Sequence, residues 1–252
     1  MISKNVQKLV RRLELKKYRQ REGLFVAEGP KVVGDLMRHG FCPTLVIATA
    51  DWLSAVPHMP VTTAVIKATT DELRRVSFLQ HPQQVLALFP LPPAAATQPP
   101  TKGRLCLALD GVQDPGNVGT IVRIADWFGI ETIYCSDDTA DVWSPKVVQA
   151  TMGSIARVSI VYTNLKELLA SAPVPIYGTL LDGDNIYQAP LTADGIIVMG
   201  NEGNGISPTV RPLISQRLLI PDFSTAADKA ESLNVAIATA ITCSEFRRRN
   251  NG

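Results

Sequence analysis

After residue 104, six short apolar runs alternate with segments of helical character, and this alternation limits the possible folds more than any other feature. The runs occupy residues 105–109, 132–136, 156–162, 175–181, 196–200 and 217–221. Two intervening segments, "SPKVVQATMG" and "SPTVRPLIS", open with Ser-Pro, which is typical of a helix start, and a long helix is expected from Ser232 onward. Apolar strands separated by helices form parallel sheets that are covered on both faces. The sequence therefore predicts an α/β fold with a mostly parallel sheet in this half.

A Pro- and Ala-rich stretch over residues 91–103 precedes this half and has no hydrophobic period, so it is expected to be a linker. Residues 1–90 combine a basic helix over residues 4–21 with further helices and strands, the strands expected at residues 24–29, 44–50 and 84–89. The sequence thus predicts a small α/β domain at 1–90 and a second domain at 104–252.

The charges are divided unevenly between the two predicted domains. Residues 1–90 carry 13 Lys and Arg against 7 Asp and Glu, a net charge of +6, whereas residues 104–252 carry 11 against 16, a net charge of −5. Residues 1–23 alone hold eight basic and two acidic side chains. A basic front on an otherwise acidic chain suits an anionic partner such as nucleic acid, although a solvated helix face has the same composition.

Composition excludes several other classes of protein. No apolar run reaches 18 residues and the first residues lack the apolar core of a signal peptide, so no membrane span is expected. The four cysteines are widely separated, with no CxxC pair, and are predicted to be buried free thiols in a reducing cytoplasm. All three histidines precede the linker, which rules out a His-based triad or metal site in the second domain.

Three strand ends of the second domain are rich in Gly, Asn and Ser: "LDGVQDPGNVGTIVR" (109–123), "VMGNEGNGISP" (198–208) and "IPDFSTAADKAESLNV" (220–235). Ligands of parallel sheets bind beyond the carboxyl ends of the strands, and glycine lets a ligand approach the backbone closely. These stretches match neither a P-loop, nor a dinucleotide fingerprint, nor a nucleophile elbow. They predict a cleft for an uncharged or cationic organic ligand, with Arg123 and Glu202 nearby.

The same stretches resemble the motifs of the SpoU/TrmH family of SPOUT-superfamily RNA ribose methyltransferases. The first is similar to N-x-G-x-x-x-R, the second to G-x-E-G-x-G, and the third to I-P followed by S-L-N-V. The matching residues are Asn117, Gly119 and Arg123; Gly200, Glu202, Gly203 and Gly205; and Ile220, Pro221, Ser232, Leu233, Asn234 and Val235. The chain departs from the family between Asp222 and Glu231, where it is longer and more polar, and this implies a reshaped floor of the cofactor pocket.

The resemblance implies a trefoil-knotted, parallel-sheet methyltransferase domain, preceded by a small substrate-binding domain similar to RNA-binding ribosomal proteins. It implies transfer of a methyl group from S-adenosylmethionine to a ribose 2′-hydroxyl of rRNA or tRNA. Main-chain groups near Thr179, Leu180, Gly200, Ile220 and Leu233 are then expected to hold the cofactor. The implied catalytic residues are Asn117, Arg123, Glu202, Ser232 and Asn234, and no metal is expected.

All of these residues except Asn234 also have a purely structural explanation. Arg123 is also suited to an ion pair with Asp126 one turn on, Asn117 to a helix cap, and Glu202 to a cap on the second Ser-Pro helix. Ser232 is a candidate N-cap of the last helix, which would leave Asn234 inside that helix among apolar residues.

Two kinds of partner are expected. The basic first helix is predicted to contact RNA through Lys8, Arg11, Arg12, Lys16, Lys17 and Arg19. The last helix is apolar around most of its circumference, and the family dimerises through this region, so a homodimer is expected. Two other functions remain open from the sequence: a catalytically silent RNA-binding or ribosome-assembly factor, and a nucleotide-dependent oxidoreductase or hydrolase.

Overall fold

The structure, a computed structural model, describes residues 1–56, 59–93, 97–98, 100–226, 228 and 230–250. The chain forms two compact units, Met1–Pro93 with Asp141–Arg157, and Ala94–Ala140 with Val158–Gly252. The segment Asp141–Arg157, expected within the second domain, therefore groups with the first unit. Residues 94–96 and 99 of the predicted linker lie outside the described residues.

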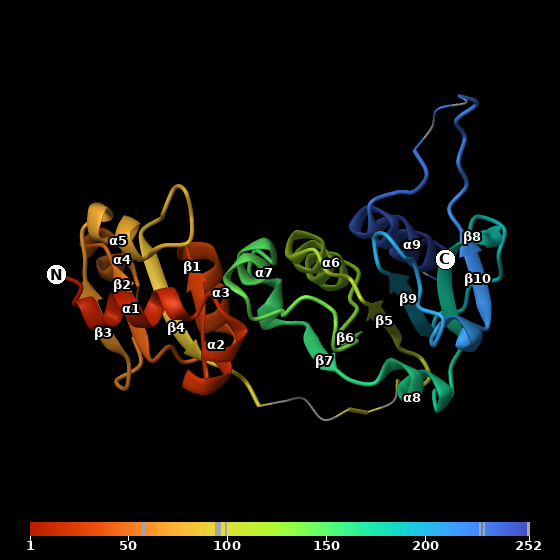
Figure 1. Cartoon of the computed structure of the whole chain (residues 1–252). Helices are drawn as coiled ribbons and strands as arrows, with labels where there is room; N and C mark the ends of the chain where they lie inside the picture. Colours follow the sequence, from red (N-terminus) through yellow and green to blue (C-terminus); the bar gives the residue numbers. More distant parts are fainter. Residues whose placement is uncertain (57–58, 94–96, 99, 227, 229, 251–252) are drawn as a thin grey trace. The chain divides into compact units, whose positions relative to one another are not determined.

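The second unit is built on a six-stranded sheet with the order β10-β8-β9-β5-β6-β7, and every neighbouring pair is parallel (Figure 1). The predicted parallel α/β fold is thereby confirmed. The strands are β5 (Leu105–Asp110), β6 (Thr132–Cys135), β7 (Ser159–Tyr162), β8 (Ile176–Asn185), β9 (Gly195–Gly200) and β10 (Gln216–Leu219).

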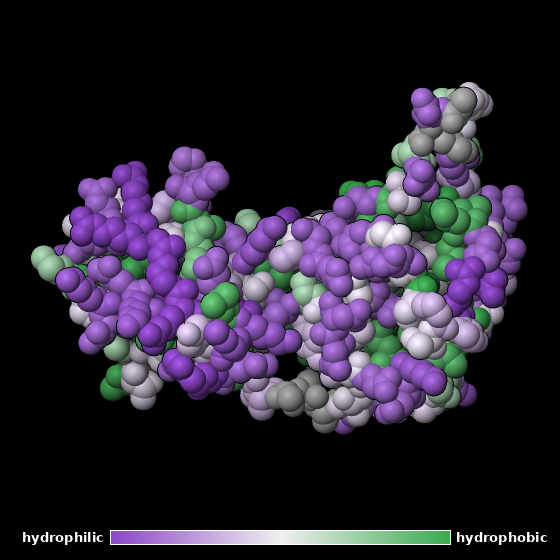
Figure 2. Space-filling view, in the orientation of Figure 1, coloured by the Kyte–Doolittle hydropathy of each residue, from purple (hydrophilic) through white to green (hydrophobic). Residues whose placement is uncertain are grey.

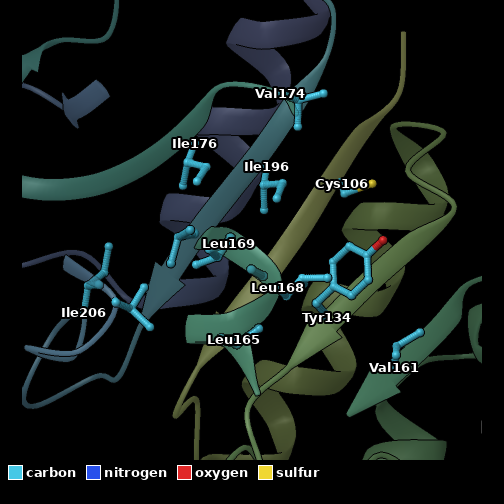
Figure 3. Packing of buried hydrophobic residues seen from close by; sticks show 13 residues of the cluster. Cys106, Tyr134, Val161, Leu165, Leu168, Leu169, Val174, Ile176, Ile196 and Ile206 are labelled. Atoms are coloured by element: carbon cyan, nitrogen blue, oxygen red, sulfur yellow. The ribbon is translucent and has the colours of Figure 1, made fainter. Parts of the chain in front are cut away.

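Helices cover both faces of this sheet. On one face, Leu165, Leu168 and Leu169 of α8 (Leu165–Ala170) pack against alternate residues of the strands, including Cys106 and Ile196 (Figure 3). On the other face lie α6 (Pro115–Trp127) and α9 (Val235–Asn250), where the rings of Tyr177 and Phe246 meet edge to face at 4.8 Å. Alternation of strand side chains between the two faces produces two apolar layers.

The two Ser-Pro segments differ in outcome. Ser144 caps α7 (Pro145–Ala150) by accepting a hydrogen bond from the Val147 N–H, so the first prediction is confirmed. The second prediction is wrong, because its segment contains only the 3₁₀ turn η2 (Arg211–Leu213). Pro212 lies in the middle of that segment and cannot donate the hydrogen bond that a continuing helix needs.

The first unit has its own four-stranded sheet, with the order β1-β4-β2-β3. Only β2 and β3 pair in parallel. The edge strand β3 was not predicted, because it is short and largely exposed and so has little hydrophobic pattern. The elements are α1 (Lys4–Arg12), α2 (Lys16–Glu22), β1 (Leu24–Glu28), α3 (Pro30–Arg38), β2 (Leu45–Ala48), α4 (Ala50–Ala55), β3 (Ala64–Lys67), α5 (Thr70–Val76) and β4 (Val85–Pro90).

The predicted basic helix over residues 4–21 is broken into α1 and α2, and Arg19 stabilises the break. Arg19 is 2% exposed. Nη1 donates to the Leu13 and Glu14 carbonyls at 2.7 Å each, at the carboxyl end of α1, where carbonyls lack helical partners. The same guanidinium forms an ion pair with Asp141. The predicted RNA contact by Arg19 is therefore wrong, because the side chain is buried and fully engaged.

Further contacts bind the segment Asp141–Arg157 into the first unit. The ring of Trp143 lies 4.7 Å from that of Phe25 in β1. Gly153, with φ of 96°, approaches Asp35 so closely that a Cβ would overlap its carboxylate. Lys31, Arg38 and Arg157 surround this carboxylate. Burial alone would raise the pKa of Asp35, but the hydrogen bonds and charges of Lys31 and Arg38 outweigh it and lower the pKa.

All four cysteines are free, but only three match the predicted burial. Cys106, Cys135 and Cys243 are buried, and burial raises the pKa of Cys106 to about 11 and that of Cys243 to about 12. Cys42 is exposed, so the prediction is wrong for that residue. Within the described residues, no helix is both long and apolar enough to cross a membrane.

The buried Arg19 network gives a direct stability prediction. Arg19→Ala should lower the free energy of unfolding by about 3–5 kcal/mol, because it leaves Asp141 without its buried partner and two helix-end carbonyls without donors. Urea denaturation followed by circular dichroism measures the change. Arg74→Ala is the matched control, since the Arg74–Asp71 pair is exposed and should contribute less than about 1 kcal/mol. Equal losses in the two variants would contradict the assigned role of Arg19.

Candidate active site

The three Gly-rich strand ends of the second unit meet at the N-terminus of α6. Strand β5 leads into this helix through residues 111–114, and the Asp114 side chain caps it by accepting from the Asn117 N–H at 2.8 Å. Strand β9, the direct neighbour of β5, leads into the loop that carries Glu202. Asn234 arrives from the third stretch, immediately before α9. The carboxyl edge of the sheet thus brings three of the predicted residues together.

The side-chain amide of Asn117 joins these stretches, and we call the resulting arrangement the Asn117 bridge. Asn117 Nδ2 donates to Glu202 Oε1 at 2.9 Å. Asn117 Oδ1 accepts from Asn234 Nδ2, also at 2.9 Å. Residues that are far apart in the sequence are therefore connected through one amide group.

Glu202 binds the N-terminus of α6, and its predicted alternative role as a cap on the second Ser-Pro segment is wrong. Its carboxylate accepts from the backbone N–H groups of Gln113 and Asp114, at 3.4 Å each. Burial alone would raise the pKa of Glu202, but the hydrogen bonds from Asn117 and these backbone groups outweigh it, and the pKa lies below its ordinary value. The carboxylate therefore stays ionised where a helix N-terminus favours negative charge.

The capping roles at the last helix also differ from the prediction. Asn234 caps α9, with Oδ1 accepting from the Ala236 and Ile237 N–H groups at 2.9 and 3.3 Å. The prediction that Ser232 is the N-cap, with Asn234 inside the helix, is wrong, because the helix begins only at Val235. Ser232 is exposed in the preceding loop. Asn234 thus uses its oxygen for the cap and its amino group for the Asn117 bridge.

The sequence interpretation missed the residues that hold the Glu202 loop in place. Asp110, at the end of β5, accepts from the Ser207 N–H at 2.7 Å, and its side chain is buried. Asn201 donates to the Gly111 carbonyl at 2.7 Å, and its Oδ1 accepts from the Gly203 and Asn204 N–H groups. The Asn-x-Gly spacing of Asn201 and Gly203 is typical of such a turn and could have identified it.

Gly200 is required at this loop for a packing reason. A Cβ on Gly200 would overlap the backbone of Gly205 and Ile206. The Asn201–Gly205 bridge folds the loop back on the end of β9, and only glycine permits that approach.

Arg123 is not part of the Asn117 bridge. It lies six residues after Asn117 on α6, about 9 Å along the helix axis and on a different face. The side chain is exposed and makes no hydrogen bond or ion pair with another described residue. Trp127, one turn further along the same face, is 85% exposed. The structure therefore presents Arg123 and Trp127 to solvent, although the surrounding sequence is apolar.

Of the predicted cofactor residues, Thr179 and Leu180 lie on β8, and Gly200 ends the neighbouring strand β9. The pairing of β8 is irregular from Thr179 onward. Gly178 of β8 pairs with Val198 of β9 on one side and with Arg217 of β10 on the other. The next residue of β10, Leu218, pairs with Asp184, so the register skips five residues of β8. Residues 179–183 therefore leave the ladders, and their main-chain groups, including those of Thr179 and Leu180, are not used in sheet pairing. Such groups suit an organic ligand that is recognised through backbone hydrogen bonds.

The remaining predicted cofactor residues frame the same edge of the sheet. Gly200 ends β9, and Ile220 follows β10 and is half-buried. Leu233 is 49% exposed at the end of the long loop before α9. The described residues of this loop form no helix or strand, and Figure 1 shows it extending outward between β10 and α9. The described residues of the segment where the chain departs from the family motif are therefore part of an exposed loop.

The parallel sheet and the main-chain groups at its carboxyl edge define an α/β protein built to bind an organic cofactor. Residues 104–244 match the SpoU rRNA Methylase family, and residues 4–87 match the MRM3-like substrate binding domain. The chain belongs to the SpoU rRNA Methylase family.

Solved structures and a curated relative agree with this assignment. A putative RNA methyltransferase of the TrmH family from Porphyromonas gingivalis is 45% identical, with a TM-score of 0.89 over 99% of both chains. An AdoMet-bound rRNA methyltransferase from Sinorhizobium meliloti is 29% identical, with a TM-score of 0.85 over 99% of this chain and 96% of that one. The 23S rRNA (guanosine(2553)-2′-O)-methyltransferase RlmP of Bacillus subtilis is 29% identical over 94% of each chain.

The Asn117 bridge predicts how Glu202 titrates. Its pKa, measured by carboxyl ¹³C NMR, should lie below 4.5 in the wild type and rise in Asn117→Ala, which removes a hydrogen bond to the charged form. A lowered pKa in the folded state stabilises the protein above about pH 4.5, and this contribution is lost as the pH falls through the folded value. Asn164→Ala, which removes a comparable bond to Glu167, should leave Glu202 unchanged. An unaltered Glu202 pKa in Asn117→Ala would refute the bridge.

Proposed function

We propose that this protein transfers the methyl group of S-adenosylmethionine to a ribose 2′-hydroxyl of ribosomal RNA. The Asn117 bridge is the observation that carries the proposal, because it joins one polar residue from each of the three family motifs at one edge of the sheet. The relatives named as 2′-O-methyltransferases of rRNA support ribose as the target and rRNA as the substrate class.

The cofactor would be held by main-chain groups at Thr179, Leu180, Gly200, Ile220 and Leu233. When bound, S-adenosylmethionine supplies a methyl group that is already activated on a sulfonium. The protein must then hold the ribose oxygen in line with that group and help the oxygen to lose its proton. Orientation can contribute about 7–11 kcal/mol, whereas a general base typically adds about 10²–10⁴-fold. Positioning therefore carries most of the rate.

Arg123 is assigned the electrostatic part of the reaction. Its guanidinium is exposed and without a partner among the described residues, so all of its donors are available to RNA. A guanidinium is protonated at any physiological pH, which makes it a poor base and a good clamp for a phosphate or a developing alkoxide. Asn117, Glu202 and Asn234 act as positioning residues that fix the N-terminus of α6. Ser232 is expected to join the site from the loop.

Two copies of the chain are proposed to pair through α9. Ile237 is 52% exposed on this helix. Beside it lies an open, largely apolar hollow, lined by Phe128, Tyr187, Ala240, Ile241, Ser244 and Glu245. Figure 2 shows hydrophobic surface gathered around α9. A symmetric interface would remove this surface from water. We place the protein in the cytoplasm, where its free thiols stay reduced.

The catalytic proposal is tested by radiolabelled methyl transfer to unmodified ribosomal RNA and tRNA, followed by digestion to nucleosides. The wild type should label ribose-methylated nucleosides of the ribosomal RNA. Arg123→Ala should lower kcat by about 10²–10³, because it removes charge stabilisation in the transition state. Calorimetric affinity for S-adenosylmethionine should be unchanged in this variant.

Arg104→Ala is the control for the loss of an exposed arginine, since Arg104 pairs with Glu131 on the same unit and should not affect turnover. Cofactor binding without transfer to either RNA would contradict the proposal and favour a silent RNA-binding factor. Label in tRNA alone would overturn the substrate class.

The dimer is tested by sedimentation velocity. The wild type should sediment as a dimer at micromolar concentration, and Ile237→Asp/Ile241→Asp should shift it to a monomer by placing charges in the apolar interface. Val65→Asp alters an exposed apolar residue of the first unit and should leave the dimer intact. A monomeric wild type would overturn the proposal.

A further inference from the structure

Three cations of the first unit gather around one aromatic ring. Tyr18 lies in α2 and is half-buried. The guanidinium carbons of Arg12 and Arg21 lie 5.6 and 4.7 Å from its ring centroid, and Lys17 Nζ lies 5.0 Å from it. We call these four residues the Tyr18 cluster. Each contact is within the range of a cation–π interaction, and together they concentrate positive charge at one place on the surface.

The charge of the Tyr18 cluster is not balanced within the described chain. Arg21 pairs with Glu22 at 2.5 Å. Arg12 and Lys17 form no ion pair with any described residue, so the cluster keeps an excess of two positive charges. Like charges held this close repel one another, and an anion from solution would relieve the repulsion. Figure 2 shows a hydrophilic surface over α1 and α2.

The other basic residues of these helices provide a contrast. Arg19 is buried in the ion pair with Asp141. Arg11 donates to the Arg75 carbonyl at 2.9 Å and lies over the Phe78 ring. These two arginines therefore stabilise the folded unit through their hydrogen bonds and ion pair. The contacts of Arg12 and Lys17 are those with the Tyr18 ring. Tyr18 and Arg21 stand out only in the structure, because their role depends on which side chains surround the ring.

We infer that the Tyr18 cluster binds the phosphate backbone of the RNA substrate, and this inference rests on the proposed function. The ring holds the three cations close together, so that adjacent phosphates can meet two or more of them. The Tyr18 hydroxyl adds a neutral donor and acceptor suited to a phosphate or a ribose 2′-hydroxyl. Contacts of this kind supply affinity without reading the sequence, and they release counterions.

The test uses the full-length protein and an unmodified 23S rRNA transcript, with filter binding over a range of KCl concentrations. Arg12→Ala/Lys17→Ala should weaken binding about tenfold or more at physiological salt. It should also flatten the slope of log affinity against log salt by about 1.5, because two phosphate contacts are lost. Tyr18→Ala should weaken binding through loss of the ring, whereas Tyr18→Phe should retain most of the affinity. S-adenosylmethionine affinity and the midpoint of urea unfolding should be unchanged throughout, which together exclude misfolding of either unit.

Arg74→Ala/Arg75→Ala is the matched control, because it removes the same charge from the surface of the same unit. The proposal is overturned if this control and Arg12→Ala/Lys17→Ala lose affinity and slope equally, which would show only a net-charge effect. It is also overturned if the Tyr18 cluster variants bind RNA like the wild type while methyl transfer persists, and in that case the proposed function stands. If the wild type neither binds nor methylates RNA, both proposals fail. Variants that lose binding to polyglutamate but not to RNA would instead indicate an acidic protein partner.

Discussion

The side-chain amide of Asn117 is the interaction on which the arrangement of the site depends. An amide has one end that donates and one that accepts, and each end has a single suitable neighbour here. The Glu202 carboxylate can only accept, so it takes the amino end of Asn117. The oxygen is thereby turned to Asn234, whose own oxygen is already committed to capping α9. Each hydrogen bond of this series therefore has a fixed donor and a fixed acceptor. A carboxylate in place of the Asn117 amide could not donate to Glu202 and so could not satisfy both neighbours.

This series of hydrogen bonds can form only because the loop carrying Glu202 is held at both ends. Asp110 and Asn201 attach it to the end of β5, and Gly200 lets the loop fold back on β9 without a clash. Loss of any of these contacts would move Glu202 away from the backbone N–H groups that keep it ionised. The glycines of the motif therefore serve close packing of backbone as well as access for a ligand. Some residues of such a motif are therefore needed for the conformation of the loop and not for the reaction itself.

Much of this was predictable where the signal is local. Apolar runs and the turns between them indicated the six parallel strands, and the family motifs identified Asn117, Glu202 and Asn234. The rest depends on contacts between distant residues. Nothing near Arg19 in the sequence indicates that Asp141 will bury it, and the helix break that it stabilises follows from that contact. Likewise, the start of α9 is set by Asn234, because its second hydrogen bond to Asn117 favours it over Ser232 as the cap. Capping preferences alone do not distinguish the two residues.

The division of charge gives a physical reason for keeping two units in one chain. Residues 104–252 carry a net charge of −5, and a polyphosphate chain would be repelled by such a surface if it had to bind there unaided. The basic residues 1–90 can supply that affinity through phosphate contacts. Binding energy from these phosphate contacts can then be used to orient the ribose at the acidic unit. Arg123, an exposed cation of that unit, needs only to act locally on the bound nucleotide. Affinity and chemistry can thus be tuned separately, which suits the proposed methyl transfer to RNA.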